Sequence, residues 1–209
     1  MRKIFLLLAV LLTLSTVLAA PVAALPPGPY YYWGKIGQAI IELPSLPQLM
    51  IEALDIKIST PIAPHDSLGI SIYIPEFGDF IPLVYVTDNE DCAELLEAAF
   101  GPIFPWVPVV FLEDESDLEI RARVTVVLNV PVVGVLPDGT EVMIPSFNMK
   151  LRGWGRGEWI EETTVLPDYT MWVGAWAYSA TGGIIIDGCE YQIGEASVGH
   201  YIMVITENP

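Results

Sequence analysis

The stretch Leu118-Glu-Ile-Arg-Ala-Arg-Val-Thr-Val-Val-Leu-Asn-Val130 alternates with a period of two along its whole length. Every second residue from Leu118 to Val130 is apolar, so these side chains share one face of a strand. The opposite face begins charged, at Glu119 and Arg121, and becomes more apolar toward its end. The pattern predicts a strand with one face against a core. We place it as the central strand of an all-β domain.

Further strand patterns flank this stretch on both sides. Short apolar or alternating runs bounded by Gly, Pro and Asp predict strands, and Pro137-Asp138-Gly139 predicts a hairpin turn between two of them. Twelve such runs predict a jelly-roll-like β-sandwich of two packed sheets. The predicted strands are 49–59, 68–74, 80–87, 107–113, 118–130, 132–136, 140–144, 147–152, 158–165, 170–179, 183–186 and 198–206.

One short α-helix is predicted within this β pattern, at about residues 89–100. Thr87 and Glu90 have the spacing of a capping box, acidic residues fill the first turn, and Gly101-Pro102 ends the helix. Cys92 belongs to its apolar face, so the pattern directs this thiol toward the sheet.

The composition excludes two classes of partner. The 209 residues are 53% apolar and carry a formal net charge of -17. Nucleic acids and anionic membranes are polyanions, so neither fits such a chain. Only two cysteines occur beside 18 prolines, a composition typical of a heat-resistant protein.

The N-terminal segment predicts export. Arg2 and Lys3 precede an apolar run, and small residues up to Ala24 suit cleavage there, so residues 1–24 read as a signal peptide. A retained membrane anchor is the alternative, but the run is at the lower limit of a spanning helix. The expected localisation is secreted, extracellular or on the cell surface, with no membrane association after removal.

Residues 25–45 predict an extended arm, and residues 46–209 the β-sandwich domain. The arm is rich in proline and aromatic residues, and Pro44 and Pro47 separate it from the strand pattern that begins at Leu49. Its strand-like part needs hydrogen-bond partners, which the sheet edge of a neighbouring subunit could supply, with Ile36, Ile40 and Ile41 entering that subunit's core. The alternative is an ordinary first strand of the same chain.

The two cysteines, Cys92 and Cys189, are the candidates for one disulfide in an exported chain, with two free thiols as the alternative. Enzyme motifs do not occur. His65 and His200 lack zinc spacing, and there is no Gly-x-Ser-x-Gly or Ser-x-x-Lys sequence. The sequence therefore predicts a protein that is not an enzyme.

The acidic run Asp114-Glu-Ser-Asp117 offers hard oxygen ligands, so Asp114, Glu115 and Asp117 are candidate Ca2+ ligands, and no other cofactor is expected. A solvated turn between strands is the alternative.

A tryptophan-rich segment includes Trp154 and Trp159, whose exposed rings would stack on sugars in a carbohydrate-binding module. Trp172 and Trp176 share one strand face with Tyr178, an arrangement that favours a packed core.

Taken together, signal, arm and sandwich resemble the archaeal extracellular filament subunits with a TasA-like or cannula-like β-sandwich. The resemblance covers the whole chain in layout and includes no fingerprint motif. It implies a secreted structural subunit of a cell-surface filament or pilus, which self-associates into homopolymers by donor-strand complementation. A secreted carbohydrate-binding module with a polysaccharide partner is the alternative function.

Overall fold

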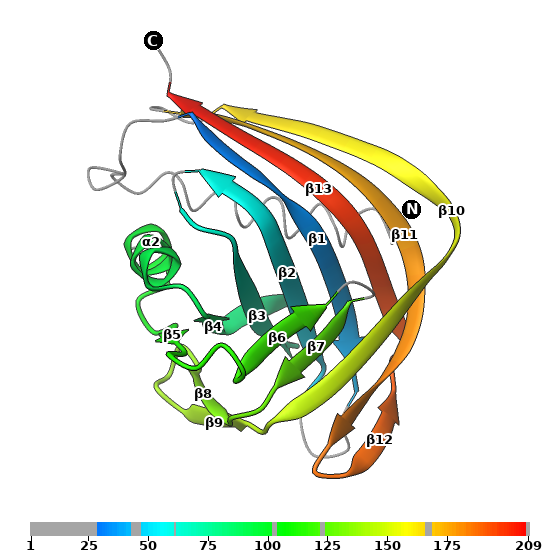
Figure 1. Ribbon diagram of the computed structural model, residues 1–209. Helices are drawn as coiled ribbons and strands as arrows, with labels where there is room; N and C mark the ends of the chain where they lie inside the picture. Colours follow the sequence, from blue (N-terminus) through cyan, green and yellow to red (C-terminus); the bar gives the residue numbers. More distant parts are fainter. Residues whose placement is uncertain are drawn as a thin grey trace.

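The computed structural model describes residues 29–42, 47–60, 62–101, 104–121, 124–165 and 169–207. These residues form an all-β protein with one short helix (Figure 1). Its elements, in chain order, are β1 (Tyr30–Ile41), β2 (Leu49–Thr60), β3 (His65–Ile74), β4 (Asp79–Thr87), α2 (Glu90–Phe100), β5 (Val109–Phe111), β6 (Leu118–Arg121), β7 (Thr125–Leu128), β8 (Val132–Val135), β9 (Glu141–Ile144), β10 (Phe147–Val165), β11 (Tyr169–Ile186), β12 (Cys189–Gln192) and β13 (Glu195–Glu207).

Among the described residues, eleven strands belong to a single sheet, and β8 and β9 form a separate two-stranded one. The order of the large sheet is β5-β4-β3-β2-β1-β13-β11-β10-β7-β6, with β12 paired to β11. All its pairings are antiparallel except that of β4 with β5. The sheet curves so strongly that β6 and β7 lie within its concave side, in front of β1 and β2 (Figure 1). The all-β prediction is confirmed, and the strand pairing does not confirm a jelly-roll-like sandwich.

The stretch predicted as the central strand is instead a hairpin at one end of the sheet. β6 pairs with β7 in register, Leu118 opposite Leu128 and Ile120 opposite Val126. Val124, with φ 51°, lies in the turn that reverses the chain. Residues that pair across this turn are both even-numbered or both odd-numbered, so the apolar set stays on one face. Alternation therefore identified the buried face and could not reveal the fold-back.

The described part of the segment predicted as an arm forms β1, in the middle of the sheet. β1 pairs with β13 on one side and β2 on the other, so Ile36, Ile40 and Ile41 lie inside their own chain's sheet. Ile36 and Ile41 are buried there. The structure therefore shows the second possibility, in which this segment is an ordinary first strand of its own chain. The predicted signal peptide, residues 1–24, lies outside the described residues.

The predicted helix is confirmed, with its first residue one position later. Asn89 is the N-cap, and its side chain accepts a hydrogen bond from the Cys92 amide at 2.9 Å. The Gly101 amide donates to the Glu97 carbonyl at the other end. No helix among the described residues is long and apolar enough to span a membrane.

The concave side is filled at one end by the main core. Successive cross-strand partners on β1, β2 and β3 place small and branched apolar residues on this face, and β6, β7 and the start of β10 cover them. Gly37 allows the closest approach, because a Cβ there would lie 2.0 Å from a methyl of Val124. The core at this end includes Ala39, Ile41, Leu49, Ile51, Leu68, Ile70, Val126, Leu128 and Met149.

Candidate functional site

Beyond the core, the concave face becomes polar and then aromatic. Two residues along β1 from Gly37, one cross-strand row runs over six strands of the sheet. Cross-strand partners have their side chains on one face, with neighbouring strands about 4.8 Å apart. The row consists of Asp66, Asp55, Lys35, His200, Trp176 and Trp159, from β3 to β10.

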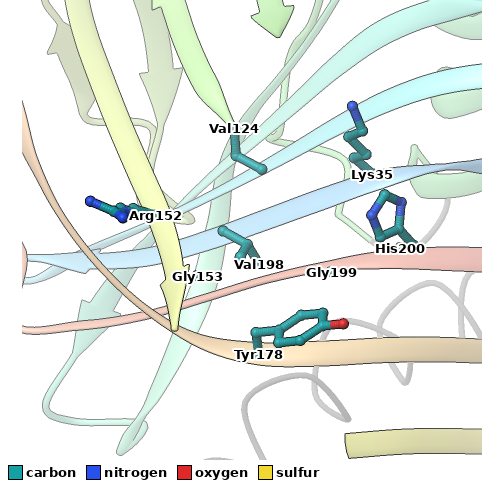
Figure 2. A pocket seen from close by; sticks show the side chains of 8 residues that line it. All are labelled: Lys35, Val124, Arg152, Gly153, Tyr178, Val198, Gly199 and His200. Carbon is teal, nitrogen blue, oxygen red and sulfur yellow. The ribbon is translucent and has the colours of Figure 1, made fainter. Parts of the chain in front are cut away.

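A pocket of about 480 Å³ opens where this row meets the core. Its walls come from β1, β10, β11, β13 and the residue before β7. Figure 2 shows Lys35 and His200 together on one side of the pocket, with the Tyr178 hydroxyl toward the same side and the Arg152 guanidinium on the opposite side. The lining residues are Lys35, Val124, Arg152, Gly153, Tyr178, Val198, Gly199 and His200, and we call this the Lys35 pocket.

The polar side chains of the pocket have no partners within the described part of the chain. The side chains of Lys35 and His200 make no hydrogen bond or ion pair there, and the same holds for the Tyr178 side chain. Asp55 lies opposite Lys35, and its Oδ1 is paired with the Lys57 ammonium at 2.6 Å, whereas its buried Oδ2 has no hydrogen-bond partner among the described residues. In a chain with nine basic residues and 26 acidic ones, Lys35 thus has an ammonium group with no ion pair among the described residues. It is suited to an anion.

A β-bulge lies next to Lys35 in the sheet. The register of β1 with β2 shifts between Trp33 and Gly34. A Cβ on Gly34 would lie 2.0 Å from the Asp55 carbonyl oxygen, so only glycine fits this close approach. The extra residue of the bulge is on β2. Trp33 shares the concave face because it lies two residues beyond Lys35 on β1, where it pairs with Ile202.

Asp66 closes the other end of the polar row. Its Oδ2 accepts a hydrogen bond from the Ile120 amide at 2.7 Å, which satisfies a donor on the edge strand β6. Burial raises the pKa of Asp66 to about 7, with the nearby Asp55 and Asp88 adding to it. On the convex side, burial raises the pKa of Glu52 to about 8.

The tryptophans predicted as a sugar platform lie on opposite faces. Trp159 pairs with Trp176 in the polar row, whereas Trp154 pairs with Ser179, whose side chain is on the other face. Five positions separate the two tryptophans, so alternation along β10 puts them on opposite faces, and the irregularity between Trp154 and Glu158 does not change this because it adds an even number of residues. Trp154 and Trp159 therefore cannot contact one sugar. Trp176, which we expected in a core, is 41% exposed.

A second polar cluster lies under the helix on the convex side. The Cys92 sulfur is 3.6 Å from the Ser67 hydroxyl, and the His65 Nδ1 is 2.7 Å from the Ala63 carbonyl. Although burial opposes it, hydrogen bonds from His65, Ser67 and Thr87 lower the pKa of the Cys92 thiol. Burial likewise opposes the raised pKa of His65, which the Cys92 contact supports. Both side chains are buried, so this pair is closed to a ligand.

The predicted disulfide is not formed in the structure. Cys92 is a buried free thiol beneath α2, whereas Cys189 is an exposed free thiol. Cys189 begins β12, directly after the Asp187-Gly188 turn that connects it to β11. The two cysteines belong to different parts of the fold, so the alternative of separate thiols holds.

The predicted calcium ligands form an exposed turn. The Asp114 side chain accepts a hydrogen bond from the Ser116 amide at 2.9 Å, and its carbonyl accepts one from the Asp117 amide. Hydrogen bonds from Ser116 lower the pKa of Asp114. The described residues contain no group of three His, Cys, Asp or Glu side chains arranged to hold a metal ion.

The pocket residues were not predicted from the sequence. Lys35 falls in the segment predicted as an arm, and His200 lies in a run that predicts an ordinary strand. Only the pairing of the first strand with the last one brings these two residues together. No local motif carries that information, although both sit among alternating residues.

No protein-family model and no curated protein matches the chain. Among solved structures, it is similar in fold to an acetoacetate decarboxylase, with a TM-score of 0.44 and 11% identity over 90% of this chain and 93% of that one. A Legionella pneumophila acetoacetate decarboxylase gives 0.41 and 12%, covering 87% and 86% of the two chains. A candidate AttH protein from Nitrosomonas europaea gives 0.29 and 12%, over 91% of this chain and 58% of that one.

These neighbours correct the functional predictions. None of the three is a filament subunit or a carbohydrate-binding module, and two bear the name of an enzyme. The predictions of a donor-strand filament, of a carbohydrate-binding module and of a protein that is not an enzyme are therefore wrong on this comparison. At this level the likeness concerns the fold alone, so the function has to be argued from the pocket.

Proposed function

We propose that the Lys35 pocket binds small organic carboxylates. The observation that carries this proposal is the pair Lys35 and His200, adjacent on β1 and β13 and without partners among the described residues. An ammonium group supplies charge-assisted hydrogen bonds to a carboxylate, and an imidazole can donate one in either protonation state.

The rest of the pocket favours an organic anion over an inorganic one. Val124 and Val198 form an apolar wall beside the polar pair, and Tyr178 adds a hydroxyl on the same side (Figure 2). Pockets for small molecules combine an apolar lining with a few polar groups that orient the ligand. A carboxylate attached to a short carbon skeleton satisfies both parts.

The experiment is a titration of tryptophan fluorescence with propionate and benzoate. Trp176 lies opposite His200 and provides the signal. Saturable quenching is expected, and Lys35→Gln should weaken binding about ten- to a hundredfold, because one charge-assisted hydrogen bond contributes roughly 1.5–3 kcal/mol.

The matched control is Lys150→Gln, which removes an exposed lysine of β10 outside the pocket. It should bind like the original protein. Equal affinity of the Lys35→Gln and Lys150→Gln proteins, or the same quenching with butylamine, would contradict the proposal.

A further inference from the structure

Exposed apolar side chains continue from the Lys35 pocket along the concave face. Trp33 and Ile202 lie two residues beyond Lys35 and His200 on β1 and β13, and Trp176 and Trp159 extend the polar row across β11 and β10. Each of the four is between 40% and 45% exposed. We call these residues the aromatic strip. Large apolar side chains that share one exposed face mark a binding surface.

The rings of the strip are held in place although they are exposed. The Trp159 indole donates a hydrogen bond to the Glu161 carboxylate at 3.2 Å, and its ring centroid is 6.3 Å from that of Trp176. Gly157 leaves room for the Trp176 ring, since a Cβ there would lie 2.1 Å from the indole nitrogen. Gly174 does the same for Trp159, at 2.7 Å. The apolar surface is thus formed before any ligand arrives.

The two ends of this surface differ in polarity. The pocket end has Lys35 and His200, and the strip beyond it presents ring faces and the Ile202 side chain. A short hydrophilic acid would occupy the first and leave the second in water. An anionic head with an apolar tail covers both.

We infer that the ligand is an amphiphilic carboxylate of the fatty-acid class, with its head at Lys35 and His200 and its tail along the aromatic strip. This inference rests on the proposed function and names its ligand class. Tyr31, also exposed, follows Trp33 on the same face of β1, and the four steps from Lys35 to Tyr31 span about 13 Å, which sets the length of tail that the face can cover.

Calorimetric titration with acetate, butyrate, hexanoate, octanoate and decanoate tests the inference. Affinity should rise about fourfold for each methylene added, the value for a fully buried CH₂, until the tail passes the strip. Acetate and decanoate that bind equally well would overturn the inference and leave the proposed function standing. If no carboxylate binds, both fail.

A matched pair of tryptophan variants locates the tail. Trp176→Ala should weaken decanoate binding about tenfold, since an apolar contact is lost. Trp154→Ala removes another exposed tryptophan, on the opposite face of the same sheet, and should bind decanoate like the original protein. Equal losses in both variants would overturn the placement of the tail.

Light scattering with and without decanoate tests a second copy of the chain as the occupant. The inference predicts a monomer in both samples. A dimer that persists in decanoate and dissociates in Trp176→Ala would show that another copy covers the strip, and would overturn the inference.

Discussion

One half of the concave sheet face is buried in this protein, and the other half is exposed. Along β1, Ala39 and Ile41 are fully buried beneath the β6–β7 hairpin, whereas Trp33, on the same face of the same strand, is 40% exposed. Strand composition does not separate the halves, because both are rich in large apolar residues. The difference is whether another element covers the face. The covered half provides stability, and the uncovered half is available for a ligand.

The boundary between the halves is where the polar residues gather. Asp66 accepts from the Ile120 amide at the edge of the hairpin, and Lys35 opens onto the pocket. A carboxylate is thus used where the edge strand needs an acceptor, and a cation faces the space left uncovered. Paired substitutions, one in the covered half and one in the uncovered half, can therefore test this comparison.

The largest expected effect is a difference in stability between two isoleucine truncations. Ile70→Ala leaves a cavity in the filled half, where Ile70 is 0% exposed, and should lower the free energy of unfolding by about 2–5 kcal/mol. Ile202→Ala acts on the uncovered half, at 42% exposure, and should cost less than about 1 kcal/mol. Urea denaturation measures both. Similar losses would show that the two halves are packed alike.

The pH dependence of stability tests two buried carboxyl groups, Asp66 at the boundary and Glu52 on the convex side. Burial raises the pKa of Asp66 from an ordinary 3.8 to about 7, and that of Glu52 from 4.5 to about 8. Between these values the folded protein binds protons that the unfolded chain has released, so stability should fall as the pH rises from about 4 to about 8.

Asp66→Asn and Glu52→Gln isolate these groups from the general repulsion of the acidic chain. Each variant should flatten the decline in thermal midpoint over the same pH range. A decline that is as steep in both variants as in the original protein would assign the effect to overall charge.

The smallest expected effect concerns the cysteines. With both thiols free, reduction should leave the thermal midpoint unchanged, and a thiol reagent should modify exposed Cys189 rapidly and buried Cys92 only after unfolding. Mass spectrometry of the labelled peptides gives the two rates. A peptide pair joined by a disulfide would contradict the structure.

Local patterns predicted local features well. The helix at Glu90–Phe100, the β8–β9 hairpin around Pro137-Asp138-Gly139 and the buried face of Leu118–Leu128 all result from spacing that neighbouring residues set. The short strand β12, after the Asp187-Gly188 turn, was not predicted.

What sequence could not supply was pairing over distance. The pairing of β1 with β13 joins residues about 165 positions apart, and it alone creates the Lys35 and His200 pair. Prolines at positions 44 and 47 suggested an isolated arm, yet β1 before them pairs along its length with β2 after them. By contrast, the opposite faces of Trp154 and Trp159 follow from their spacing of five positions in one strand.

The most direct test of the central claim is a crystal structure of the protein with decanoate. Our account predicts the carboxylate within hydrogen-bond distance of the Lys35 ammonium and the His200 imidazole, with the tail against Trp176 and Trp159. A carboxylate bound elsewhere, or an aromatic strip covered by another copy of the chain in the presence of decanoate, would contradict it.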